Sequence, residues 1–330
     1  MTALSLPAGT IGVPATAAPP YLPHPLHSSA RTWTETNCYV DLWVEVLHSL
    51  ELDPVAAGAV TLSADFDGDQ WTFLKHPPED LFALYGVEVA ELNVWRPLAD
   101  HIADHLDRGR LLTLEVDSFW LPDTAGVSYR LQHTKTTIAV AEFAPTGRRL
   151  GYFHGAGFHH LQGDDLVGVL REQTGPDALA PYVEVVRLDR LHRDPERLLA
   201  AARALTAAHL ARRPADNPVV RLGDRMLADL PWLAEQGMET FHSYAFATCR
   251  QCGATAELAA EFCEWLGERT GGGLTEAVAG FRSAAETAKS LQFQLARAVR
   301  GRSVDLAGTL EELAGSWARA VTVVAGLHAG

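Results

Sequence analysis

The chain has 330 residues, of which 47% are hydrophobic and 21% are charged, which suits an ordinary globular protein with room for two domains. Its 41 acidic residues outnumber the 27 lysines and arginines, and a formal net charge of −14 disfavours a nucleic-acid surface. The sequence contains no apolar run long enough to cross a membrane, and its four cysteines do not resemble a secreted disulfide framework. We therefore expect a cytoplasmic protein.

The chain begins with small and apolar residues, MTALSLPAGTIGVPATAAPP. This stretch lacks the basic start and the continuous apolar core of a signal peptide. We expect a flexible N-terminal tail over residues 1–27.

A buried helix is predicted to begin near residue 38. Apolar residues recur there at helical spacing, namely Val40, Trp43, Val44, Leu47 and Leu50. Thr36 and Asn37 are residue types that cap helix N-termini, so Cys38 falls in the first turn. Free backbone N–H groups and the helix dipole favour a thiolate at that position. Cys38 is thus a candidate nucleophile of the papain type, with a buried structural thiol as the competing interpretation.

The hydrophobic pattern then changes from helical to extended. Helices are predicted over 79–86, 94–107 and 164–172, and strands over 111–117, 136–143, 148–153, 158–162 and 181–188. The first half is therefore expected to combine helices with a mainly antiparallel sheet. From residue 189 onward, five Ala- and Leu-rich helical segments are separated by Gly or Pro breaks. The predicted fold class is α+β over residues 28–188, followed by an all-α helical bundle domain over 189–330.

A nucleophilic cysteine needs a base, and His133 is the best-placed histidine of the 14 in the chain. It lies where a loop gives way to the strand predicted at 136–143. A base at the edge of a sheet that faces a helix N-terminus is the usual arrangement for thiol acyl transfer.

Three segments carry a resemblance to a known family: NCYVDLW at 37–43, VDSFWLPD at 116–123 and QHTKTTIAV at 132–140. They resemble the amino-terminal domain of the butirosin biosynthesis protein H family. The resemblance implies a papain-like acyltransferase that moves an aminoacyl group from a carrier-protein thioester to an amine acceptor. It implies that Cys38 is the acyl-accepting nucleophile and that His133 is the general base and acid. Asp117 would contact the substrate amine or support the catalytic residues. No cofactor and no metal are implied beyond the phosphopantetheine of the partner carrier protein.

A second resemblance extends over nearly the whole chain after the tail. The cysteine helix, GDQWTF, LNVWRPL, LPDTAG, GYFH and HSYAFATCRQCG resemble a bacterial domain-of-unknown-function family that is often encoded near carrier proteins and amino acid:carrier-protein ligases. These segments supply the candidate substrate-binding residues Asn37, Gln70, Trp71, Asp123, His154, His242 and Tyr244.

The sequence departs from the butirosin-type pattern in one respect. Relatives carry Asp or Asn on the strand after the histidine, but residues 134–163 contain neither. Candidates for the third catalytic member are Glu142, His154, Gln162 and Asp117. The missing residue favours one alternative function, a non-catalytic module that binds a carrier protein. A thioesterase or amidase of the same geometry also stays open, because it differs only in whether water reaches the acyl-enzyme.

Two further groups of residues were considered. Cys249, Cys252 and Cys263 are interpreted as structural thiols, because no second cysteine pair accompanies them to complete a zinc site. An acidic carrier protein would need a local basic patch on this acidic chain. The candidates for that patch are Arg212, Arg213, Arg221 and Arg225.

Overall fold

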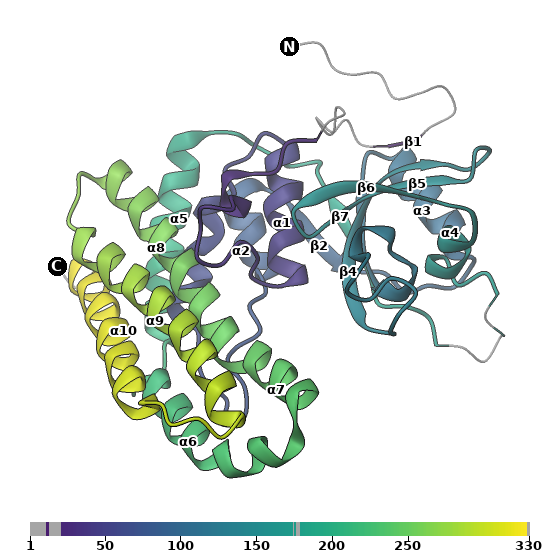
Figure 1. Ribbon diagram of the computed structural model, residues 1–330. Helices are drawn as coiled ribbons and strands as arrows, with labels where there is room; N and C mark the ends of the chain where they lie inside the picture. Colours follow the sequence, from purple (N-terminus) through teal and green to yellow (C-terminus); the bar gives the residue numbers. More distant parts are fainter. Residues whose placement is uncertain (1–10, 13–20, 174, 176–178, 329–330) are drawn as a thin grey trace. The chain divides into compact units, whose positions relative to one another are not determined.

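The computed structural model describes residues 11–12, 21–173, 175 and 179–328 (Figure 1), so most of the predicted tail lies outside the described residues. The chain forms two compact units. The sheet unit comprises residues 1–27, 38–54 and 77–193, and the helical unit comprises 28–37, 55–76 and 194–330. The helical unit thus takes in two segments of the N-terminal half that the predicted contiguous domains, 28–188 and 189–330, assign elsewhere. No helix in the described part of the chain is long and apolar enough to cross a membrane.

An antiparallel sheet organises the sheet unit, as predicted. Among the described residues its six main strands lie in the order β2-β7-β3-β4-β5-β6, and the short β1 also pairs with β4. The predicted strands agree with the observed ones to within two residues, but β1 and β2 were not predicted. The strands are β1 (Ile11–Gly12), β2 (Glu88–Glu91), β3 (Leu111–Asp117), β4 (Lys135–Ala144), β5 (Arg149–His154), β6 (Gly157–Gln162) and β7 (Val183–Arg187).

The register of this sheet brings the end of β3, the start of β4 and the end of β5 together. Asp117 at the end of β3 pairs with Lys135 at the start of β4. Because β5 runs antiparallel to β4, with Phe153 opposite Ala139, His154 lies at the same end of the sheet. The loops at this end carry most of the candidate residues of the first half.

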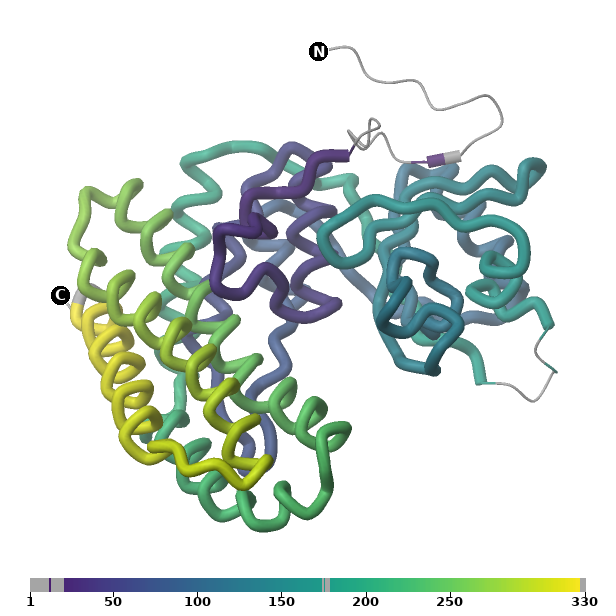
Figure 2. The backbone as a smooth tube through the Cα atoms, in the orientation of Figure 1, coloured from purple at the N-terminus to yellow at the C-terminus, as the bar shows by residue number. Residues whose placement is uncertain are grey.

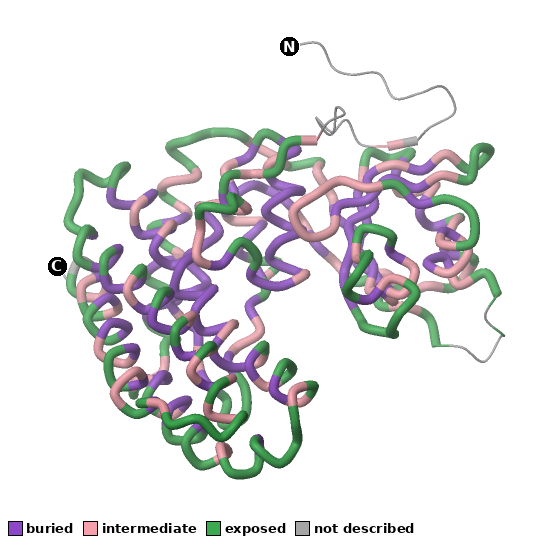
Figure 3. Tube along the Cα trace, viewed as in Figure 1, coloured by how far each residue is buried: buried purple, intermediate pink, exposed green. Residues whose placement is uncertain are grey.

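Helix α1 (Cys38–Ser49) begins at the predicted residue and packs against β4 and β5. Figure 3 shows it buried along almost its whole length, and the burial includes two acids, Asp41 and Glu45. Polar groups that are buried this deeply need partners, and α1 obtains them from the segment before it. The other helices of the sheet unit are α2 (Pro78–Tyr85), α3 (Leu98–Asp107) and α4 (Gly163–Val169).

Residues 21–27, expected as the end of the flexible tail, are instead tied to α1. The Tyr21 hydroxyl donates to Glu45 Oε2 at 2.5 Å, and His27 bonds Glu45 Oε1 through Nδ1. His27 Nε2 also lies 3.5 Å from Asp41 Oδ1. Burial alone would lower the pKa of His27, but its hydrogen bonds to the two carboxylates raise that pKa to about 9. A charged imidazole therefore offsets part of the negative charge of the two buried acids of α1.

The helical unit is built mainly from long helices, and α9 and α10 run side by side in Figure 2. The third predicted helical segment is divided by a π-helical turn, Phe246–Arg250, between α7 and α8. The core of the helical unit also contains Trp33 and Trp71, which come from the two N-terminal segments and are almost fully buried. The helices are α5 (Pro195–Arg212), α6 (Pro218–Gln236), α7 (Met238–Ala245), α8 (Gln251–Thr270), α9 (Thr275–Val299) and α10 (Leu306–His328).

Candidate functional site

The centre of the candidate site is an acid–imidazole pair at the shared end of β3 and β4. His133 Nδ1 lies 2.5 Å from Asp117 Oδ2. The other oxygen, Asp117 Oδ1, accepts the backbone N–H groups of Phe119 and Thr134 at 3.0 and 3.3 Å. Both carboxylate oxygens are therefore engaged, which fixes the acid on the strand end. Of the candidates for a third catalytic member, Asp117 is the one that contacts His133.

The His133 ring is also held from one side by an aromatic face. It stacks on Phe119 with the ring centroids 4.5 Å apart and an interplanar angle of 17°. The side chain is 71% exposed, and within the described residues its Nε2 has no hydrogen-bond partner. An imidazole that is oriented through Nδ1 presents Nε2 for proton exchange with a substrate, which is the arrangement of a general base.

A second acid–imidazole pair lies at the same end of the sheet. His154 Nδ1 is 2.5 Å from Asp123 Oδ2, and His154 Nε2 is 2.8 Å from the hydroxyl of Thr136 on β4. Both nitrogens of this ring are occupied, unlike those of His133. The side chains are only 12% exposed for His154 and 9% for Asp123, although the main chain of Asp123 is open to solvent.

The charge state of this second pair follows from its contacts. Burial alone would raise the pKa of Asp123, but the hydrogen bond and charge of His154 outweigh it and lower that pKa. The Tyr152 hydroxyl donates to the same carboxylate. Burial, with Asp123 beside it, raises the pKa of Tyr152. A fully engaged, buried network of this kind suits a structural role better than proton transfer.

Cys38 is the first residue of α1 and is partly exposed. Among the described residues, no hydrogen bond connects its thiol with His133. The next residue, Tyr39, lies close enough to Glu184 on β7 for that carboxylate to add to the effect of burial, and the pKa of Tyr39 is raised. The side chain of Tyr39 thus reaches the neighbourhood of Glu184.

The other three cysteines are buried in the helical unit, where burial raises the pKa of Cys249 and Cys263 to about 12. The pKa of Cys252 is raised by burial as well. Thiols in such surroundings stay protonated and unreactive. In the described part of the chain, no group of three potential metal ligands comes together.

The remaining candidate substrate-binding residues belong to the helical unit. Asn37 is buried, and its side-chain amide donates to the Leu74 carbonyl at 3.1 Å. Gln70 lies in an exposed turn, whereas the indole of Trp71 is in the core and donates to Thr255 Oγ1 at 3.2 Å. His242 is exposed on α7.

Tyr244 and two arginines of the predicted basic patch contact carboxylates. The Tyr244 hydroxyl donates to Asp229, which also pairs with Arg225 at 2.7 Å. Arg221 pairs with Asp65 and Asp216. Two of the four arginines proposed for carrier docking are therefore neutralised by carboxylates within the same unit.

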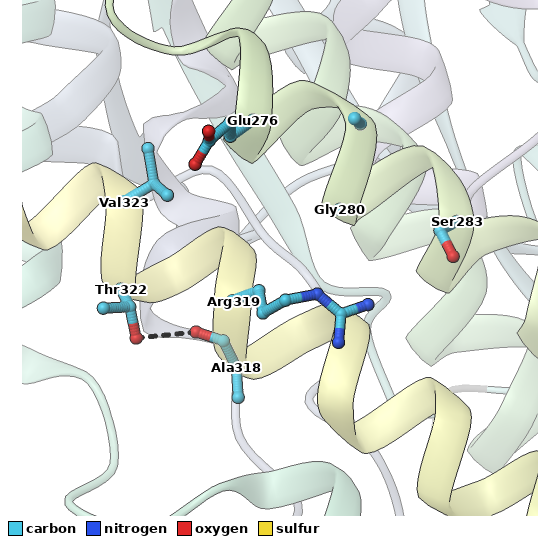
Figure 4. A pocket seen from close by; sticks show the side chains of 8 residues that line it. Glu276, Gly280, Ser283, Ala318, Arg319, Thr322 and Val323 are labelled. Carbon is cyan, nitrogen blue, oxygen red and sulfur yellow. Dashed lines mark hydrogen bonds between the residues drawn. The ribbon is translucent and has the colours of Figure 1, made fainter.

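Each unit has a cavity in its described part. One, of about 320 Å³, lies in the sheet unit and includes Trp120 and Arg130 in its lining. Another, of about 620 Å³, lies in the helical unit between α9 and α10 (Figure 4). The lining of the second cavity is mostly small residues, with Glu276 and Arg319 as its charged groups and neither histidine nor cysteine. It lacks the residue types that acyl transfer requires.

The structure thus defines an α+β protein with an oriented acid–imidazole pair at one end of its antiparallel sheet, joined to a helical unit. Residues 22–188 match the DUF1839 N-terminal domain, and residues 195–326 match the DUF1839 C-terminal domain. The chain belongs to the DUF1839 family, a family of unknown function, as the second resemblance predicted. No curated protein matches the chain.

Sequence reasoning missed the second pair. Asp123 and His154 were each candidates for substrate binding, but nothing in their spacing of 31 residues indicates a direct contact. The signal that could have indicated this contact is the predicted hairpin of β4 and β5. In a hairpin the end of the second strand lies beside the start of the first, which brings His154 back to the loops that follow β3.

Proposed function

We propose that this protein is a papain-like, cysteine-dependent acyl or aminoacyl transferase that takes its acyl group from a carrier-protein thioester and passes it to an amine. The observation that carries the proposal is the Asp117–His133 pair, which has the orientation of a catalytic acid–base group. Cys38 as the first residue of α1 supports it, because a helix N-terminus favours a thiolate. The resemblance to the butirosin biosynthesis protein H family supports the carrier-protein donor.

In the first half-reaction, the Cys38 thiolate attacks the carbonyl carbon of the donor thioester. The tetrahedral intermediate expels the phosphopantetheine thiolate, which takes a proton from His133 Nε2, and the acyl group remains on Cys38 as a thioester. In the second half-reaction, the acceptor amine attacks this carbonyl and loses its proton to His133 as the Cys38 thiolate leaves. An amide replaces a thioester, and no oxidant or metal is needed.

Asp117 is a positioning residue in this scheme. By accepting from Nδ1–H, it holds the tautomer in which Nε2 can accept a proton, and it stabilises the imidazolium that forms. The competing reaction is hydrolysis, which needs only water in place of the amine. A transferase must therefore position its acceptor and exclude water from the acyl-enzyme.

The test is intact-mass spectrometry of the full chain after mixing with aminoacyl-loaded carrier protein. The wild type should gain the mass of one aminoacyl group as a hydroxylamine-sensitive thioester, and Cys38→Ala should gain nothing. Cys263→Ala is the matched control, because it removes a buried thiol and should acylate like the wild type. Asp117→Asn should form the adduct at least about 100-fold more slowly.

Two outcomes would contradict the proposal. One is the absence of an adduct on the wild type with every aminoacyl group tried, together with carrier-protein binding that Cys38→Ala leaves unchanged, which would indicate a binding module. The other is an adduct that water removes as fast with amine acceptors as without them, which would indicate a thioesterase.

A further inference from the structure

The smaller cavity, in the sheet unit, is a feature that the proposed function leaves unused. Its volume of about 320 Å³ is at the lower end of the range for small-molecule sites. It lies wholly within the sheet unit, and α4 forms one wall. The lining comprises Trp120, Arg130, Asp164, Val167, Gly168, Arg171 and Gln173.

Two arginines in this lining have a left-handed backbone. Arg130 has φ 57° and Arg171 has φ 56°, and only two other described non-glycine residues have positive φ. Glycine adopts this conformation without the steric penalty that a side chain incurs. Arg171 also follows the end of α4, where glycine is the usual residue. Both positions thus carry a long side chain where glycine would have the lower backbone energy.

Arg130 connects the cavity with the acid–imidazole pair. Its guanidinium lies 4.4 Å from the centroid of the Trp120 ring and 5.4 Å from that of Phe119. Phe119 is the ring on which His133 stacks. Trp120 and Phe119 therefore lie in succession between the cavity and the candidate base.

Trp120 is held in the cavity wall by close packing on α4. A Cβ atom added to Gly168 would lie 2.1 Å from the Trp120 ring, so only glycine allows the indole to lie there. The wall is thereby fixed, and the cavity does not depend on a mobile side chain. Arg171 is anchored too, since it donates to the Leu179 carbonyl at 2.7 Å.

The charges of the cavity are mixed. The guanidinium of Arg130 forms an ion pair with Asp165, and Arg171 and Asp164 supply one further charge of each sign. A simple anion would meet nearby carboxylates, and a simple cation would meet two guanidinium groups. A small molecule that carries both an ammonium and a carboxylate can pair with each, while its apolar part packs on Trp120 and Val167.

We propose that this cavity binds a free amino acid. The carboxylate pairs with the guanidinium of Arg171, and the ammonium faces Asp164. Binding of the amino acid does not depend on the proposed acyl transfer.

The experiment is fluorine NMR on the full chain labelled with 5-fluorotryptophan, with the Trp120 resonance assigned through Trp120→Phe. L-Amino acids are titrated to about 10 mM, so that millimolar affinity is detected. The panel contains L-norleucine with two matched analogues, hexanoate without the ammonium and pentylamine without the carboxylate. At least one amino acid should shift the Trp120 resonance saturably, and each singly charged analogue should bind about tenfold or more weakly.

Arg171→Gly provides a variant in which loss of binding cannot come from a strained fold. Glycine relieves the left-handed backbone, so this variant should be at least as stable as the wild type and should bind about tenfold or more weakly. Arg148→Gly is the matched control, because Arg148 also has positive φ, 46°, but lies outside the cavity lining. It should bind like the wild type. Inorganic phosphate should leave the Trp120 resonance unshifted.

Several results would overturn the proposal. They are the failure of every amino acid to shift the resonance, binding of hexanoate or phosphate as tight as that of the amino acids, or equal binding by the wild type and Arg171→Gly. Because binding is measured without an acyl donor and is expected to persist in Cys38→Ala, its outcome is independent of the acylation test. A protein that binds amino acids but never acylates would retain this site and lose the proposed function.

Discussion

The four cysteines differ more in their surroundings than in their sequence context. Cys38 is partly exposed at the start of a helix, whereas Cys249, Cys252 and Cys263 are fully buried. Burial raises the pKa of Cys263 to about 12, so its thiol stays protonated at pH 8. Reactivity toward electrophiles is therefore expected to concentrate on one thiol.

We predict that iodoacetamide at pH 8 adds a single group to the native protein, on Cys38. Peptide mapping by mass spectrometry after a time course measures this directly. The three buried thiols should react only after denaturation, because each is protonated and shielded. Cys38→Ser should take up no label on the same time scale. Several adducts on the native wild type would contradict the assignment.

At the residue scale, the sequence predicted which side chains matter better than it predicted their partners. Cys38 was placed in the first turn of its helix because capping residue types precede it. Asp117 could be named only as one candidate among four, because its contact with His133 depends on the register of β3 and β4. Register is a property of strand pairing, which a single sequence does not encode locally.

Helix α1 depends on a network of buried charges. Glu45 is fully buried, and burial alone would raise its pKa, but hydrogen bonds from His27 and Tyr21 lower it. The pKa of His24 is lowered to about 4 by burial and by the neighbouring His48. These shifts make the stability of the sheet unit depend on pH in both directions.

The sign of each contribution follows from the direction of its shift. The pKa of His27 rises from 6.5 to about 9 on folding, so its stabilisation is complete below pH 6.5 and is lost as the pH rises through 9. The lowered pKa values of Glu45 and His24 make stability fall as the pH drops below 6.5 and then below 4.5. Stability should therefore be greatest close to pH 6.5.

We predict that His27→Gln removes most of the stability loss between pH 7 and 9, measured by urea denaturation at each pH. Glu45→Gln should lower the free energy of unfolding by about 3 kcal/mol near pH 7, because Tyr21 and His27 lose their hydrogen bonds to a charged carboxylate. His133→Gln is the control, since that side chain is 71% exposed and should leave the profile unchanged. Identical alkaline profiles for the wild type and His27→Gln would refute the role of His27.

In the helical unit, α8 packs closely on an indole from the N-terminal half. A Cβ atom added to Gly253 would lie 2.6 Å from Trp33 Nε1, which donates to the Ala285 carbonyl. We predict that Gly253→Ala destabilises the unit by about 1–3 kcal/mol in thermal unfolding, despite the better helix propensity of alanine. Gly326→Ala in α10, which meets no atom within 4 Å, should be neutral or stabilising by up to about 1 kcal/mol. Equal effects of the two variants would exclude close packing as the cause.

At the element scale, the hydrophobic pattern predicted the long helices and the main strands, because apolar residues recur in them at helical spacing or in short continuous runs. The strand β2 (Glu88–Glu91) was missed because four residues, two of them glutamates, give no alternation to detect. The ordered segment 21–27 was missed for a different reason. Its partners lie on α1, and a tyrosine and two histidines near a glycine- and proline-rich start carry no periodic signal.

The two units do not correspond to two halves of the sequence. Segments 28–37 and 55–76 belong to the helical unit, and its core contains Trp71, which packs edge to face on Trp317 with the centroids 5.1 Å apart. Family matches and composition both place a boundary near residue 190, yet packing crosses it. The composition of these two segments therefore does not indicate the unit to which they belong.

We predict that residues 194–330, expressed alone, do not form a cooperatively folded domain. Removing Trp33 and Trp71 deletes two almost fully buried indoles, and losses of that kind cost about 3–5 kcal/mol each. Near-ultraviolet circular dichroism and thermal unfolding would report the loss of fixed tertiary packing, with retained helix in the far ultraviolet. A sharp unfolding transition like that of the full chain would contradict the prediction.

Because the N-terminal segments pack against the C-terminal helices, the core of the helical unit can form only late in synthesis on the ribosome. Trp71 and its hydrogen-bond partner Thr255 are 184 residues apart. At a translation rate of roughly 5–20 residues per second, Thr255 is synthesised about 10–40 s after Trp71. Throughout this interval the nascent chain exposes large aromatic side chains that the sheet unit cannot bury. Chaperones that shield apolar segments of nascent chains should therefore engage this protein early, and the yield of folded protein should depend on them more than its size suggests.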